Sequence, residues 1–277
     1  MSGQDSSPVS PQAGPIAGAS VITPSIEAVL PAYAAIGLEA VAQTPGWGSL
    51  PPVQAEQVGN TVFLAGPSGR SWLQLLEVPD AETVDRYRHG GWFSLEVGSI
   101  DVHALASELA DNPGFRILAG PAPLAVSEHI IALQVIGPSG ELYYFTEVRR
   151  KLAPFSLPMP QYRLDELFIA VALTADRTAA LNFWRGITGS DGLAIETRIG
   201  VLNRGLGLAD DTQLPVGLVQ LAGANLVEID QVPVATPRPA LAAGTAMISV
   251  HGARSGHVQG VDGEWLELLG PKPQPRR

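Results

Sequence analysis

The sequence predicts an α+β fold of two domains, each made from a pair of βαβββ modules that form one cupped mixed sheet. Three observations predict it: a strand–helix–strand–strand–strand order in one stretch, partial copies of that stretch elsewhere, and a content of 30 Gly and 24 Pro, which suits short strands and turns. A βαβββ unit is too small to close its own core, so we expect it to occur with copies of itself.

The clearest module spans Gly91–Val148. Its helix is predicted at residues 101–110, where apolar residues at i, i+3, i+4 and i+7 from Val102 make one stripe. Asp101 is a good N-cap, and Asn112-Pro113-Gly114 ends the helix. Apolar extended runs follow, and the turn Gly137-Pro138-Ser139-Gly140 leads into the last strand.

Copies of the helix and of the turn occur in the first, third and fourth modules. Ser25 and Asp176 are cap residues, and an apolar stripe follows each of them. Pro31 should kink or weaken the first of these helices, because proline removes a helical hydrogen bond. The turn recurs at residues 66–69 and 260–263, each time before a strand.

The fourth module is predicted to be truncated. It starts with a strand at Thr245–Val250, and only Gly252–Gly256 separates that strand from the next, so it lacks a helix. We therefore expect its side of the domain to be more open. The predicted organisation is a disordered tail at 1–14, a paired-module domain at 15–150, a Pro-rich linker at 151–163 and a second paired-module domain at 164–272.

Composition limits the partners. The net charge of −10 disfavours nucleic acids and anionic membranes, which require clustered Lys and Arg. No apolar run approaches the roughly 20 residues of a membrane helix, and the first residues do not form a signal peptide. Cysteine is absent, which removes disulfides and thiolate chemistry. We expect a cytoplasmic protein, monomeric or homodimeric, whose partner is a small apolar or aromatic molecule.

This pattern resembles the vicinal oxygen chelate superfamily, which includes glyoxalases, bleomycin-resistance proteins and extradiol dioxygenases. The helices with aromatic residues at Ser25–Tyr33 and Asp176–Trp184 carry the resemblance, together with the turns at 137–140 and 260–263. The resemblance implies paired modules that cup a pocket. It also implies a divalent metal, held by His or Glu on the first strand of a module and by Glu on its last strand.

The expected ligand positions depart from that pattern. The first-strand positions are Gly18, Ser94, Ile169 and Met247, and the last-strand positions are Gln74, Tyr144, Glu228 and Glu267. The first-strand set lacks imidazole, which iron and zinc sites generally need, whereas magnesium or calcium can use oxygen alone. We therefore expect no cofactor. If a divalent metal is bound, the candidate ligands are Glu267, Glu228 and His251, with His257 nearby.

Two groups of residues are candidates for acid/base chemistry. Glu228 and Glu267 lie in apolar strands, and if both face one cup the pKa of one must rise, which makes it a usable acid or base. Alternation on a second strand puts Trp92, Ser94 and Glu96 on one face. Tyr144 takes the partner position, so Glu96 is a candidate base and Tyr144 a proton donor. The remaining candidate substrate contacts are Gln74, His129 and His251.

Three functions are compatible with these residues. The leading hypothesis is an enzyme that moves a proton on a small apolar or aromatic oxygenated compound, as an isomerase, dehydratase or lyase, without the usual metal. The second is a divalent-metal extradiol dioxygenase or glyoxalase-like enzyme with rearranged ligands. The third is a non-catalytic small-molecule binding or resistance protein. In the alternative without a functional site, the polar residues of these strands face solvent and have no role in catalysis or binding.

Overall fold

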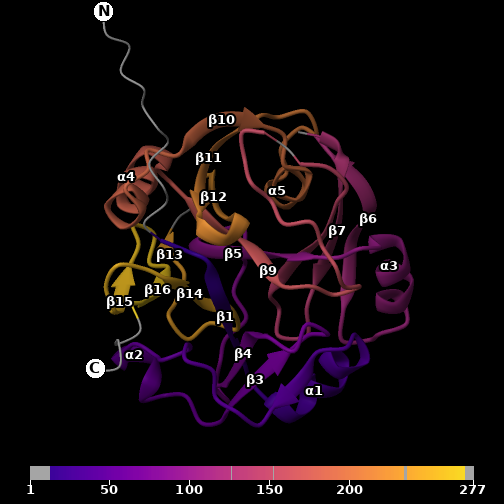
Figure 1. The fold of residues 1–277 in the computed structure, drawn as a ribbon, viewed down its shortest axis with the longest axis vertical. Helices are drawn as coiled ribbons and strands as arrows, with labels where there is room; N and C mark the ends of the chain where they lie inside the picture. Colours follow the sequence, from indigo (N-terminus) through magenta and orange to yellow (C-terminus); the bar gives the residue numbers. More distant parts are fainter. Residues whose placement is uncertain (1–12, 126, 152, 234–235, 272–277) are drawn as a thin grey trace, which may run out of the picture.

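The computed structural model describes residues 13–125, 127–151, 153–233 and 236–271. The tail expected at 1–14 falls almost entirely outside these residues. The chain is a mixed α+β structure with two large sheets and few helices, as the sequence predicts (Figure 1). Among the helices of the described ranges, none has the length and apolar character needed to cross a bilayer.

Each module contributes a run of consecutive elements. The first contains β1 Ile16–Thr23, α1 Ile26–Ala35, β2 Glu39–Val41, α2 Pro52–Ala55, β3 Thr61–Ala65 and β4 Ser71–Glu77. The second contains β5 His89–Gly98, α3 Val102–Ala110, β6 Arg116–Leu124, β7 Ser127–Ile136 and β8 Leu142–Val148. The third contains β9 Leu167–Thr174, α4 Arg177–Thr188, β10 Leu193–Thr197, α5 Gly200–Leu206, β11 Leu214–Leu221 and β12 Asn225–Gln231. The short strand β13 Thr236–Pro237 precedes β14 Gly244–His251, β15 Gly256–Gln259 and β16 Trp265–Leu269 of the fourth.

The cap residues identified in the sequence begin the three long helices. Ser25 accepts a hydrogen bond from the Ala28 amide, and the carboxylates of Asp101 and Asp176 each accept two backbone amides. Pro31 lies inside α1 without ending it. The expected absence of a helix between β14 and β15 is also found.

The sheets pair the modules differently from the predicted order. The first module shares a seven-stranded sheet with the fourth, in the order β15-β16-β14-β1-β4-β3-β2. The second shares the other sheet with the third, in the order β10-β11-β12-β9-β5-β8-β7-β6, with β13 added beside β5. The expected pairing of neighbouring modules within 15–150 and within 164–272 is therefore wrong. Nested and consecutive pairing satisfy the same strand and helix patterns, so local sequence does not distinguish them.

The main hydrophobic core lies between the two sheets. It takes one face of each sheet and the apolar sides of the long helices, including Tyr33, Leu105 and Trp184, all fully buried. The opposite face of each sheet carries a separate, smaller apolar cluster. We call the face formed by β5, β8, β9 and β12 the open cup, and the face formed by β1, β4, β14 and β16 the closed cup. The sheet of the open cup curves, and α5 lies inside its curve (Figure 1).

Candidate functional site

Strand registers make the two cups equivalent position by position. In the open cup, Glu96 pairs with Tyr144 on one side and Ile169 on the other, while Glu228 pairs with Val171. In the closed cup the same relations hold for Ser20 with Gln74 and Met247, and for Glu267 with Ser249. Glu228 of the open cup therefore corresponds to Glu267 of the closed cup, and the Glu96–Tyr144 pair corresponds to Ser20–Gln74.

The open cup contains a cavity of about 310 Å³. Its walls are mainly apolar and come from β7, β9, β10, β11 and the segment after β8, with Ile130, Phe155, Leu157, Phe168, Ile195 and Val216 among them. Polar side chains also line it, and five of them, Ser94, Glu96, Tyr144, Glu228 and Asp230, come from the strands of the open cup. Four of these five were predicted from the sequence, and the structure brings those four together.

Glu96 is the best placed ionisable group of the cavity. Burial raises its pKa to about 8, and the nearby negative charge of Glu228 acts in the same direction. The Thr146 hydroxyl donates a hydrogen bond of 3.3 Å to Glu96 Oε2 and opposes the rise in pKa. The phenol of Tyr144 is also buried, which raises its pKa well above 10, so it stays protonated at neutral pH.

Glu228 and Asp230 form a second carboxyl pair at the cavity. Burial raises the pKa of both groups. The hydrogen bond between them requires that one of the two carboxyl groups keeps a proton. Asp230 is not among the predicted site residues, although it stands two residues after Glu228 and so shares its face of β12. The expected like-charge pair was Glu228 with Glu267; the actual neighbours of Glu228 are Asp230 and Glu96.

Two polar atoms at the cavity lack a partner. Ser94 Oγ and Asp230 Oδ1 are buried and have no hydrogen-bond partner within the described part of the chain. Both side chains are at most 1% exposed. Buried polar atoms in native proteins are nearly always bonded to protein, water or ligand, and leaving one unpaired costs about 1–3 kcal/mol. An ordered water or a polar group of a ligand can supply the missing hydrogen bonds at these two atoms.

Trp92 does not reach the cavity. The register between β5 and β9 shifts between Trp92 and Ser94, so the alternation that predicted a shared face is broken there. Trp92 instead joins the main core, where its ring lies 6.5 Å from that of Trp184 and its indole nitrogen donates a 2.8 Å hydrogen bond to the Trp265 carbonyl. The structure therefore places Trp92 in the main core and not at the open cup.

The two histidines assigned to substrate also lie elsewhere. His129 sits on β7 with its ring 3.8 Å from Glu128, and its neighbour Ile130 lines the cavity in its place. His251 is exposed at the end of β14, where its backbone bonds to Gly14 and Pro15.

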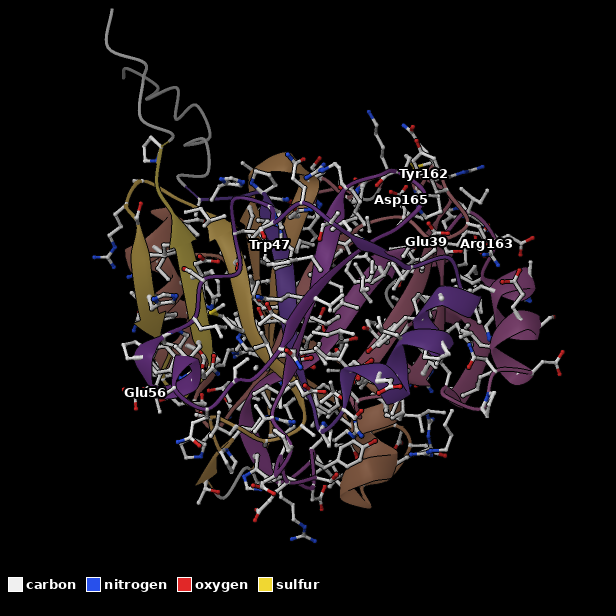
Figure 2. The ribbon with its side chains drawn as sticks, turned by 90° about the horizontal axis from the view of Figure 1, so that it is seen from below. Glu39, Trp47, Glu56, Tyr162, Arg163 and Asp165 are labelled. Atoms are coloured by element: carbon white, nitrogen blue, oxygen red, sulfur yellow. The ribbon has the colours of Figure 1, made fainter. Side chains whose placement is uncertain are left out.

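The closed cup is filled by the chain itself. Residues 42–51 connect β2 to α2, and within them Trp47 is buried against Phe63, with ring centroids 5.1 Å apart and nearly perpendicular planes. Figure 2 shows Trp47 beside the indigo and yellow strands of this sheet. A Cβ atom at Gly18 would lie 2.4 Å from the Trp47 ring, so the glycine at this first-strand position makes room for the indole.

The polar residues of the closed cup fasten this loop. Glu267 accepts hydrogen bonds from the Gly48 amide at 2.6 Å, the Ser49 amide at 3.0 Å and the Ser249 hydroxyl at 2.6 Å, and a further one from the Ser49 hydroxyl. Gln74 donates to the Gly48 carbonyl at 3.0 Å. Glu267 and Gln74 therefore hold the protein's own backbone, not a substrate, and the side expected to be more open is the closed one.

Loop length explains the difference between the cups. Residues 42–51 separate β2 from α2 in the first module, which is enough chain to fold into the cup. The corresponding connection of the third module, between β10 and α5, consists only of Arg198 and Ile199. This short connection stays at the cavity wall, so the open cup keeps its space.

The donor set does not fit the divalent metal that the fold implies. Within the described ranges, no group of three or more His, Cys, Asp or Glu side chains is arranged to hold a metal ion. The candidate ligands Glu228 and Glu267 lie on different sheets, and His251 does not line the cavity of the open cup. His257 bonds to the Ser49 carbonyl at 2.8 Å. We therefore derive no chemistry through a metal.

Comparison with solved structures agrees with this architecture. Glyoxalase I from Zea mays has a TM-score of 0.61 with this chain at 12% sequence identity, and the match covers 92% of each chain. A variant of glyoxalase I from the same plant gives a TM-score of 0.61 at 13% identity and covers 92% of this chain and 93% of that chain. A 2,3-dioxygenase from Pseudomonas sp. KL28 matches more loosely, with a TM-score of 0.38 at 14% identity over 79% of this chain and 72% of that one.

No protein-family model and no curated protein matches the sequence. The structural likeness extends over nearly the whole chain, and at these identities it establishes the fold. The chain has the fold of glyoxalase I, which confirms the fold predicted from the repeated modules.

Proposed function

We propose that the protein is an acid/base enzyme that moves a proton on a small, largely apolar or aromatic oxygenated compound in the open cup. The observation that carries the proposal is the Glu96–Tyr144 pair at the cavity, beside the Glu228–Asp230 pair. A carboxyl group whose pKa lies near neutral pH can take and return a proton in the same catalytic cycle. Apolar walls suit the substrate class that the sequence predicts.

Each polar residue has a separate role in this proposal. Glu96 acts as the base, because a pKa of about 8 makes its carboxylate a stronger proton acceptor than an ordinary glutamate. Tyr144 lies next to it in strand register and donates its phenolic hydrogen bond to the substrate oxygen. The oxygen gains negative charge as the proton leaves carbon, so this hydrogen bond strengthens in the transition state.

The second carboxyl pair supports the base. Negative charge on Glu228 is one of the two causes of the raised pKa of Glu96. Asp230 is hydrogen-bonded to Glu228, and the proton shared in this bond keeps one negative charge on the pair. Removal of a proton next to a polarised oxygen-bearing carbon is the first step shared by isomerases, dehydratases and many lyases, so the proposal covers these reaction types together.

Proton exchange offers a test that does not require the natural substrate. The protein is incubated in D₂O with a panel of small aromatic and alicyclic ketones, and deuterium incorporation next to the carbonyl is followed by NMR. We expect catalysed exchange for part of the panel, reduced about 10²–10⁴-fold in Glu96→Gln. Tyr144→Phe should also slow exchange. Exchange that is equally fast in Glu96→Gln and wild type would exclude Glu96 as the base.

A second candidate function is binding without turnover. The observation that favours it is the closed cup, where the same fold holds an aromatic ring and two amides by contacts and hydrogen bonds alone. Saturable binding of panel members, with no exchange or product in any of them, would support this candidate against the enzyme.

A further inference from the structure

The closed cup is an internal example of what this fold binds. Trp47 supplies an aromatic ring, and the amides of Gly48 and Ser49 supply N–H groups that Glu267 accepts. Glu267 is held in the cup by the Ser249 hydroxyl as well. The occupant of this cup therefore combines an apolar aromatic body with N–H donors at the last-strand glutamate.

Glu228 occupies the equivalent position in the open cup but receives no such loop. It pairs across the strands with Val171, where Glu267 has Ser249, so one hydroxyl donor is missing as well. Its hydrogen-bond partner is Asp230, and Asp230 Oδ1 and Ser94 Oγ still lack partners among the described residues. The open cup thus keeps a last-strand glutamate acceptor, with further carboxyl acceptors beside it, and lacks the backbone N–H donors that the loop supplies in the closed cup.

The charged groups at the cavity narrow the chemical class of the ligand further. Glu96, Glu228 and Asp230 put three carboxyl groups on one cavity, and burial makes their ionisation costly without a positive partner. Arg198 is the one Lys or Arg among the described residues lining the cavity, and it is exposed. The net charge of −10 also attracts cations to the molecule.

We propose that the open cup takes an aromatic or apolar amine in its protonated form, with the N–H groups at Glu228, Asp230 and Glu96 and the apolar body against Phe155 and Phe168. The ammonium group supplies the donors and the positive charge that the cluster lacks. This inference rests on the proposed function only in placing the substrate in the same cavity.

A matched set of small probes tests the inference by calorimetric titration at pH 7. The probes are 2-phenylethylamine, 2-phenylethanol and phenylacetate, which share the phenyl ring and differ in the polar group. We expect the amine to bind about tenfold or more tightly than the alcohol, and phenylacetate to bind most weakly. Equal affinities, or tightest binding of phenylacetate, would overturn the inference.

Variants assign the effect to the cluster. Glu228→Gln and Asp230→Asn should bring the affinity for the amine close to that for the alcohol. Glu39→Gln removes one carboxylate from the exposed strand β2, outside both cups, and serves as the charge-matched control (Figure 2). It should leave the amine preference unchanged. An equal loss of preference in Glu39→Gln would show that overall charge, not the cluster, selects the amine, and would overturn the inference.

The two proposals fail separately. Selective binding of the amine that depends on Glu228, with no proton exchange on any compound, would support the ligand class and refute the enzyme. Proton exchange that depends on Glu96, with no preference for the amine, would support the enzyme and refute the ligand class.

Discussion

At the scale of single residues, the open cup depends on carboxyl groups that are difficult to ionise. The pKa of Glu96 is raised first by burial and then by the charge of Glu228, while a weak hydrogen bond from Thr146 lowers it only partly. Its partner in register is a phenol that stays protonated. A base and a hydrogen-bond donor therefore lie side by side in a cavity with mainly apolar walls.

This pair of residues predicts the pH dependence of catalysis. Glu96 must lose its proton to act as a base, so kcat/KM should rise with pH and level off above about 8. Glu228→Gln removes the neighbouring charge that helps to raise the pKa of Glu96 and should move the rise in kcat/KM to lower pH. The measurement is kcat/KM for any active panel compound between pH 5 and 9.5. If kcat/KM rises at the same pH in Glu228→Gln and in the wild type, the coupling between the two carboxyl groups is contradicted.

The sequence predicts four of the polar residues of the open cup, for a physical reason. Ser94, Glu96, Tyr144 and Glu228 are polar residues in otherwise apolar strands, and strand alternation places them on one face. The same alternation does not place Trp92 on this face, because the strand register shifts between Trp92 and Ser94 and the sequence gives no sign of this shift. Asp230 has the same pattern, a polar residue two positions after Glu228 in an apolar strand, but is not among the predicted residues.

At the scale of elements, the loop of residues 42–51 decides which cup is available. The sequence identifies a loop around Pro45 and Gly46 but not its position in the fold, because its anchors are Gln74 of β4 and Glu267 of β16, which lie far from it in the sequence. The left-handed backbone of Gly48, with φ of +87°, lets the chain turn against Gln74, where a Cβ would lie 2.7 Å from Oε1.

Truncation of the loop's aromatic anchor should therefore destabilise the protein without affecting the open cup. Trp47→Ala removes a buried ring and is expected to cost about 3–5 kcal/mol in the free energy of unfolding, measured by urea denaturation. Val53→Ala, at an exposed apolar residue of the neighbouring helix α2, is the control and should change stability little. Binding in the open cup should be unchanged in both variants. Wild-type stability in Trp47→Ala would mean that the ring does not hold the loop.

At the scale of the whole molecule, the nested pairing of modules builds the two cups from different parts of the chain. The open cup joins the second and third modules, which follow one another, through β5 and β9. The closed cup joins the two ends of the chain through β1 and β14. The sequence predicts the modules and the truncated fourth unit, but not this pairing, since every module presents the same kind of first strand to any partner.

Of the two cups, the open cup is the one with space for a ligand. Glu267 and Gln74 are committed to the loop, while Glu96 and Glu228 line a cavity of about 310 Å³. The two cups thus have equivalent strand registers, but one is filled by the chain and the other contains a cavity. The proposed acid/base chemistry depends on the ionisation of Glu96 in the open cup.

The direct measurement is a pH titration of carboxyl carbons by NMR in protein labelled at glutamate, with Glu96→Gln used to assign the resonance that disappears. The account predicts that this carboxyl titrates with a pKa of about 8. An ordinary glutamate pKa near 4.3 at this position would contradict it, because Glu96 would then be a solvated surface acid and not a buried base.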